Sequence, residues 1–254
     1  MSSHVLTDTT VLTGRSLRHI LRSPDTIITT VLMPVAIMLL FVYVFGGAIA
    51  TGANTPYVTY LLPGILLITI ASGVTYTAVR LFGDLKSGIV DRFGSLPIAR
   101  TSVLWAHVLT SLVANLVAVA AVVGVAVVMG FRTSAGVLSW LAVAGILVLF
   151  TLALTWLAVT PGLTASSMDG ASAFAYPLIF LPFLSSAFVP TAAMPGPVRV
   201  FAEYQPTTAI VDALRALLTG QPVGAELWVA LAWLVGILLV AWVLAMVAYR
   251  RRTR

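Results

Sequence analysis

The chain has 254 residues, of which 60% are hydrophobic and 9% are charged, with a net charge of +6. Soluble domains carry about 25% charged residues, so this composition excludes a soluble globular protein. The absence of cysteine excludes disulfides and thiolate metal sites. The basic excess requires no nucleic acid, because membrane topology and anionic lipid headgroups account for it.

The first 26 residues are mixed and polar, and they lack the short apolar core of a secretory signal peptide. Within them, Val11–Ser23 predicts a helix lying in the membrane interface. Its apolar residues share one helical face, namely Leu17, Ile20 and Leu21. Three arginines occupy the opposite face: Arg15, Arg18 and Arg22. The alternative is a basic flank that only fixes topology.

Residues 26–79 form a run of 54 residues without Asp, Glu, Lys, Arg or His. A helix crosses the hydrocarbon layer with about 20 residues, so this run can hold two crossings and a short turn. Along the whole chain, charge, glycine and proline bound six such segments. They are Ile27–Phe45, Tyr57–Val79, Ser102–Met129, Val137–Thr160, Ala171–Val189 and Leu227–Tyr249. The predicted fold class is an all-α integral membrane protein with six transmembrane helices, the fifth kinked at Pro177 and Pro182.

The loop between the second and third segments, residues 80–100, is the most polar stretch in the chain interior. Its apolar residues recur near helical spacing at Leu85, Ile89, Val90 and Phe93. A short amphipathic helix here would offer charged side chains to a soluble partner: Asp84, Lys86, Asp91 and Arg92. An ordinary solvated turn is the alternative. Turns need only a few residues, so a length of about 20 favours a docking element.

Basic residues predict the orientation. With both termini in the cytoplasm, 11 of the 14 Lys and Arg residues fall on the cytoplasmic side. They are Arg15, Arg18, Arg22, Arg80, Lys86, Arg92, Arg100, Arg250, Arg251, Arg252 and Arg254. This asymmetry follows the positive-inside rule.

The predicted outer segment, Pro190–Glu226, is divided by five prolines. Residues 207–218 form an amphipathic stretch with Asp212 and Arg215 on its polar side. The stretch is too short and too charged to cross the membrane. It fits a re-entrant or surface helix, which is tolerated at membrane depth where protein or a water cavity shields it.

Catalytic and metal-binding residues are not predicted. The six segments hold no carboxylate and one histidine, His107, which a structural hydrogen bond explains better than catalysis. Proton-coupled carriers place ionisable groups inside the membrane, and these segments lack a buried acid. The only lysine, Lys86, follows Leu85 where a phosphate loop requires glycine. Another polypeptide must therefore supply energy from ATP if transport is driven.

Three groups of residues together resemble the permease subunits of type-2 ABC exporters, and among them the daunorubicin-resistance group. The N-terminal group is Arg15 to Pro24, Pro34 and Phe45-Gly46. The middle group runs from Asp84 through Gly88 and Phe93 to Arg100. The C-terminal group is Phe183 to Pro190, Met194-Pro195, Gln205-Pro206, Ala213 to Arg215 and Gly220. The family usually has Asn where this chain has Gln205, and we expect this departure to have little consequence because both side chains are amides.

The resemblance implies a single transmembrane domain over residues 1–254, with an interfacial helix at 11–23, a coupling helix at 80–100 and re-entrant helices at 190–226. The chain itself would bind no cofactor or metal. Two copies of an ATP-binding subunit, carrying Mg-ATP, would contact Asp84, Lys86, Gly88, Asp91, Arg92 and Phe93. A second permease copy or a similar permease would complete the transporter in a bacterial cytoplasmic membrane.

The implied function is export of an amphiphilic substrate, such as a drug, an antibiotic or a lipid-like molecule. Candidate residues of the substrate pathway, each of which could equally pack between helices, are Thr75, Tyr76, Phe174, Tyr176 and Phe180. Alternatives are a lipid or polysaccharide exporter of the same family, a secondary carrier, a membrane-embedded enzyme, or a non-transporting subunit of such an assembly.

Overall fold

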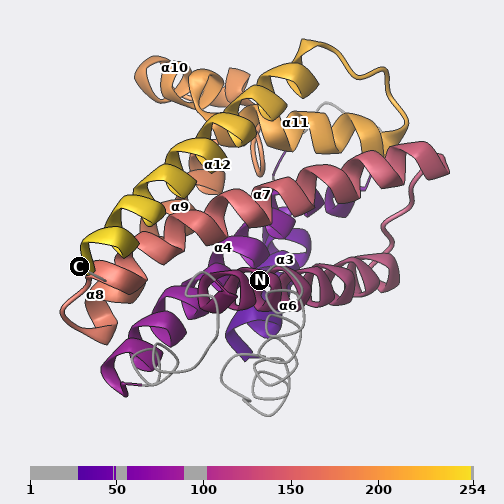
Figure 1. The fold of residues 1–254 in the computed structure, drawn as a ribbon. Coiled ribbons are helices and arrows are strands. Elements are labelled where there is room, and N and C mark those ends of the chain that lie inside the picture. The colour runs from indigo at the N-terminus through magenta and orange to yellow at the C-terminus, as the bar shows by residue number, and fades with distance from the viewer. Residues whose placement is uncertain (1–27, 48, 50–55, 89–101, 253–254) are drawn as a thin grey trace.

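A computed structural model describes residues 28–47, 49, 56–88 and 102–252. All regular structure within these ranges is helical (Figure 1). The predicted interfacial helix at 11–23 and residues 89–100 of the predicted coupling loop lie outside the described residues.

Among the described residues, four helices are long and apolar enough to cross a membrane. They are α4 (Tyr57–Lys86), α6 (Ser102–Val128), α7 (Val137–Thr164) and α12 (Ala225–Arg252). They confirm the second, third, fourth and sixth predicted segments as long apolar helices. Figure 1 shows α12 lying along α7.

The other two predicted segments form shorter, irregular helices, so six complete crossings are not established. The first comprises the π-helical η1 (Ile28–Leu32), α3 (Met33–Leu39) and the π-helical η2 (Leu40–Phe45). The fifth is divided into α8 (Met168–Ala173), α9 (Ala175–Phe180) and the 3-10 turn η3 (Leu181–Leu184). The expected irregularity of the fifth segment is therefore confirmed. One continuous helix over Ala171–Val189 is wrong, because the helix is interrupted at Phe174. It then changes to a 3-10 turn around Pro182, which has no N–H to donate.

The central helix of the fold is α4. In its most apolar stretch 89% of residues are buried, against 33% in α6, 33% in α7 and 22% in α12. Helices α3, α6, α7, α8, α9 and α11 all contact α4. Helices α6, α7 and α12, which surround α4, thus keep apolar faces exposed, as expected where lipid rather than water is the surrounding solvent.

The predicted outer segment contains η4 (Thr191–Ala193), α10 (Gly196–Tyr204) and α11 (Pro206–Thr219). Helix α11 confirms the amphipathic stretch expected at 207–218, and its buried apolar residues include Ile210, Val211, Leu214, Leu217 and Leu218. It packs against α4, α7 and α12. Gly220 ends it in the left-handed conformation, with φ 67°.

The loop between α6 and α7 holds the C-terminal end of α11. The Thr133 hydroxyl donates a hydrogen bond to the Leu218 carbonyl at 2.7 Å, and the Ser134 hydroxyl donates one to the Thr219 carbonyl at 2.6 Å. These hydroxyls satisfy carbonyls that have no partner within a helix at its last turn. The predicted outer segment is therefore fixed to the membrane helices by polar as well as apolar contacts.

Candidate functional site

The C-terminal end of α4 extends seven residues beyond the predicted span. We expected the loop to begin at Arg80, but residues 80–86 continue the helix. Neither Val79 nor Arg80 is a residue type that breaks a helix, as glycine or proline would. The helix ends instead at Lys86, where the Ser87 N–H donates to the Gly83 carbonyl at 2.9 Å and Gly88 follows in the left-handed conformation, with φ 70°.

Three of the six predicted ATPase contacts lie in or beside this extension: Asp84, Lys86 and Gly88. The other three are outside the described residues: Asp91, Arg92 and Phe93. Lys86 is exposed, and its ammonium lies 5.7 Å from the centre of the Phe82 ring. Asp84 is only partly exposed, because its carboxylate contacts α6.

The Asp84 contact is with His107. The distance from Nε2 of His107 to Oδ2 of Asp84 is 3.2 Å, and the two side chains are 8% and 41% exposed. One turn before Asp84, the Arg80 Nε–H donates to the Tyr76 carbonyl at 3.1 Å. His107 is predicted from the sequence to be a structural residue, but the sequence gives no sign that Asp84 is its partner.

The five predicted pathway residues fall into two groups. Thr75 and Tyr76 lie on α4, and the Thr75 hydroxyl donates to the Ala71 carbonyl within that helix at 3.2 Å. Phe174 joins α8 to α9 and packs partly buried against the main core. Tyr176 and Phe180 are 61% and 62% exposed. The two exposed aromatic residues therefore lie on the surface of α9.

An aromatic cluster that the sequence did not predict joins the first apolar helices to η3 and the segment after it. The Phe183 and Phe188 rings stack with 4.9 Å between centroids. The ring centroid of Phe41 in η2 lies 4.6 Å from that of Phe188, and the ring centroid of Phe180 lies 6.1 Å from that of Phe183. Phe180 therefore continues a buried cluster towards the surface of α9.

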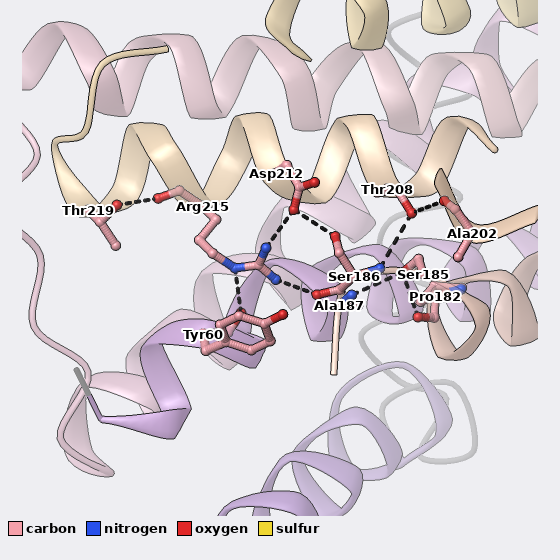
Figure 2. A network of polar contacts seen from close by, with 10 residues as sticks. All are labelled: Tyr60, Pro182, Ser185, Ser186, Ala187, Ala202, Thr208, Asp212, Arg215 and Thr219. Carbon is pink, nitrogen blue, oxygen red and sulfur yellow. Dashed lines mark hydrogen bonds and ion pairs between the residues drawn. The ribbon is translucent and has the colours of Figure 1, made fainter. Parts of the chain in front are cut away.

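A polar network centred on Arg215 ties the outer segment to α4, and we call it the Arg215 hub (Figure 2). The guanidinium donates to the Asp212 carboxylate at 2.6 Å, to the Ser186 carbonyl at 2.7 Å and to the Tyr60 carbonyl at 3.2 Å. The Ser186 hydroxyl also donates to Asp212, at 2.6 Å. One side chain on α11 thus holds the first turns of α4 and the segment after η3.

Neighbouring side chains fix the same segment. The Gln205 amide at the start of α11 donates to the Leu184 and Leu181 carbonyls at 2.8 and 3.2 Å. The Tyr57 hydroxyl donates to the Phe188 carbonyl at 2.9 Å. Gly64 permits α4 to approach Ala187 closely, because a methyl group on Gly64 would lie 2.5 Å from Cβ of Ala187. The Gln205 amide, like the Asn that the family usually has, is thus available for backbone contacts.

The profile of the ABC-2 type transporter family matches residues 7–219. The chain belongs to the ABC-2 type transporter family. The match covers α4, α11 and both polar sites described above, and it agrees with the resemblance carried by the sequence.

Several known permeases are similar to this chain over most of its length. The daunorubicin resistance ABC transporter permease protein DrrB1 of Streptomyces coeruleorubidus is 30% identical over 78% of this chain and 70% of its own. The probable doxorubicin resistance ABC transporter permease protein DrrC of Mycobacterium tuberculosis is 26% identical over 96% and 88%. The putative transport permease ycf38 of Porphyra purpurea is 25% identical over 84% and 75%.

Membership of the ABC-2 family identifies the chain as the membrane permease subunit of an exporter, homologous to drug-resistance efflux permeases. Such a permease is a non-catalytic, multi-pass membrane subunit, and its family implies that a partner hydrolyses ATP. Across the described ranges, no three His, Asp or Glu side chains gather into a possible metal site.

Proposed function

We propose that this permease moves an amphiphilic substrate outward across a bacterial cytoplasmic membrane, driven by a separate ATP-binding subunit that carries Mg-ATP. The names of the relatives, which refer to daunorubicin and doxorubicin resistance, support an amphiphilic drug as the substrate class. The absence of carboxylates from the six predicted segments also favours an amphiphile over a strongly ionic substrate.

The proposed topology has six crossings and both termini in the cytoplasm, as the basic residues favour. The shorter helices at 30–45 and 168–184 would cross by tilting little and by local thinning of the bilayer. Two ATP-binding subunits would assemble with two permeases, either two copies of this chain or this chain and a similar one. Residues 1–254 would form one transmembrane domain, in which residues 11–23 form the interfacial helix and residues 190–226 the re-entrant segment.

The observation that supports this function most directly is the extension of α4 to Lys86, seven residues beyond the predicted span. A central helix, packed against most other helices, continues without a break into the segment predicted to face the cytoplasm. A partner that bound the 80–100 segment would therefore act on the core of the permease through a rigid helix. The proposed contacts are Asp84, Lys86, Gly88, Asp91, Arg92 and Phe93.

The proposed substrate route lies between two permeases, beside α4, α8 and α9. The exposure of Tyr176 and Phe180 on α9 supports this route, because an amphiphile or a second permease could reach these side chains. Thr75, Tyr76 and Phe174 would line the same route deeper in the protein.

The experiment that tests docking replaces Asp91 and Arg92 by alanine and measures binding of the ATP-binding subunit and ATP-driven daunorubicin uptake into inverted vesicles. Both should fall, because the partner would lose its charged contacts. The matched control replaces Arg250 and Arg251, a charged pair at the predicted cytoplasmic end of α12, and should leave binding intact. Unchanged binding and export in the first variant would refute the docking assignment.

A further inference from the structure

His107 makes a polar contact that joins two helices at one end of the bundle. It lies in the first turns of α6, its side chain is 8% exposed, and its partner Asp84 lies in the extension of α4 beyond the predicted span. Their nitrogen and oxygen atoms are 3.2 Å apart. An apolar pair would suffice for packing alone, so a buried histidine at this point indicates a contact with a defined geometry.

A line of polar side chains continues from His107 along α6. Ser111 and Asn115 follow at intervals of four residues and therefore lie on the same face. The Asn115 amide donates to the Ser111 carbonyl at 2.9 Å and to its hydroxyl at 3.2 Å. The Ser111 hydroxyl in turn hydrogen-bonds with the Thr155 hydroxyl of α7 at 3.1 Å. The polar line thus connects α4 to α6 at His107 and α6 to α7 at Ser111.

The arrangement resists sliding of α4 against α6. Apolar side chains can exchange contacts at little expense, whereas a buried polar group that loses its partner is destabilised. Movement of Asp84 away from α6 would leave His107 buried without the carboxylate. The aromatic contact of Trp105 with Trp156, 5.3 Å between centroids, holds α6 to α7 near the same end. Polar and aromatic contacts thus link the α4 extension to α6 and α6 to α7.

We propose that His107 is a positioning residue for energy coupling: through Asp84 it makes α6 and α7 follow the α4 extension when the ATP-binding subunit moves it. This inference rests on the proposed function, since it needs a partner that acts on α4. Asp84 then has a role inside the permease as well as at the docking surface. Arg80, one turn earlier on α4, is the neighbouring cation, and its Nε–H is bonded to the Tyr76 carbonyl.

The test compares His107→Leu, His107→Gln and Thr110→Val in proteoliposomes that contain the permease and its ATP-binding subunit. The measured quantity is substrate transported per ATP hydrolysed, in complexes matched for partner binding and thermal stability. His107→Leu should lower this ratio about tenfold, because the polar contact with the Asp84 carboxylate is lost. His107→Gln should restore most of it, since its amide can donate to Asp84. Thr110→Val is the control, because its buried hydroxyl has no hydrogen-bond partner among the described residues.

Two results would overturn the inference. In the first, His107→Leu transports as much substrate per ATP as Thr110→Val. In the second, His107→Gln is impaired as severely as His107→Leu. A wild-type complex that fails to transport with ATP contradicts the proposed function instead, before any variant is compared.

A second measurement covers the case in which His107→Leu does not fold. The native chain has no cysteine, so Asp84→Cys/His107→Cys can be joined by a short bifunctional thiol reagent without background reaction. The joined permease should transport more substrate per ATP than the same variant before reaction. Loss of transport on joining would mean that the two helices must separate, and would overturn the inference.

Discussion

The guanidinium of Arg215 lies over the ring of Tyr60, with 3.9 Å between its central carbon and the ring centroid. The same side chain donates to the Tyr60 carbonyl, although the two residues are 155 positions apart. A short amphipathic helix of the predicted outer segment is thereby fixed to the first turns of the central helix. At the opposite end of α4, the Asp84–His107 contact fixes the helix to α6. Helix α4 is therefore held by polar contacts at both ends.

The Arg215 hub should contribute strongly to stability. Arg215→Ala removes three hydrogen bonds of a side chain that is only 18% exposed, so the free energy of unfolding should fall by about 2 kcal/mol. Thermal unfolding in detergent would measure this. Arg199→Ala is the matched control, because the Arg199 and Glu203 side chains of its ion pair are 49% and 37% exposed. The substitution should change the free energy of unfolding by about 0.5 kcal/mol or less. Equal effects of the two substitutions would contradict the importance of the hub.

Gly64 should not tolerate a methyl group. In Gly64→Ala the new Cβ would meet Cβ of Ala187, which is attached directly to the backbone and cannot rotate away. Overpacking of this kind destabilises by about 1–3 kcal/mol. Gly145→Ala in α7 is the control: apart from neighbouring backbone of α7 itself, no atom of the described residues lies within 4 Å of the added methyl, and alanine favours the helix. Thermal midpoints that fall equally, or that do not fall for Gly64→Ala, would show that α4 and residue 187 do not approach as described.

Gly73 and Asn115 should show strong coupling in a double-mutant cycle. A methyl group on Gly73 would collide with Oδ1 of Asn115, so Gly73→Ala alone should be destabilising. Asn115→Ala removes the obstructing amide, and the double variant should be more stable than the sum of the single effects predicts, by about 1 kcal/mol. Unfolding in detergent of the four proteins gives the coupling energy. Strict additivity would be inconsistent with direct packing of these residues.

The sequence was sufficient for features that depend on local composition. Long charge-free runs predicted α4, α6, α7 and α12, because only an apolar helix satisfies its backbone within a bilayer. Helical periodicity predicted α11 to within a residue or two. The charge of Arg80 predicts an end of α4 before this residue, whereas the helix continues to Lys86 and Gly88 follows it in the left-handed conformation.

The polar sites could not be predicted in the same way, because their partners carry no sequence signal. Two of the acceptors of Arg215 are backbone carbonyls, at Tyr60 and Ser186, and any residue type provides a carbonyl. The pairing of His107 with Asp84 depends on the register between α4 and α6, which emerges only from packing. A charged or amide side chain in an otherwise apolar segment was the sole available signal.

The predicted topology can be tested with single cysteines, because the chain has none of its own. Ser87 and Gln221 are both exposed and lie at the ends of α4 and α11. A membrane-impermeant maleimide should label Ser87→Cys only in inverted vesicles and Gln221→Cys only in right-side-out vesicles. Labelling of both positions from the same side would contradict the proposed topology.

The most direct test of the account is ATP-driven uptake of an amphiphile by proteoliposomes that contain this permease and its ATP-binding subunit. Uptake should require both proteins and should stop when the partner can bind but not hydrolyse ATP. Uptake or ATP hydrolysis by the permease alone would contradict the claim that a separate subunit supplies the energy.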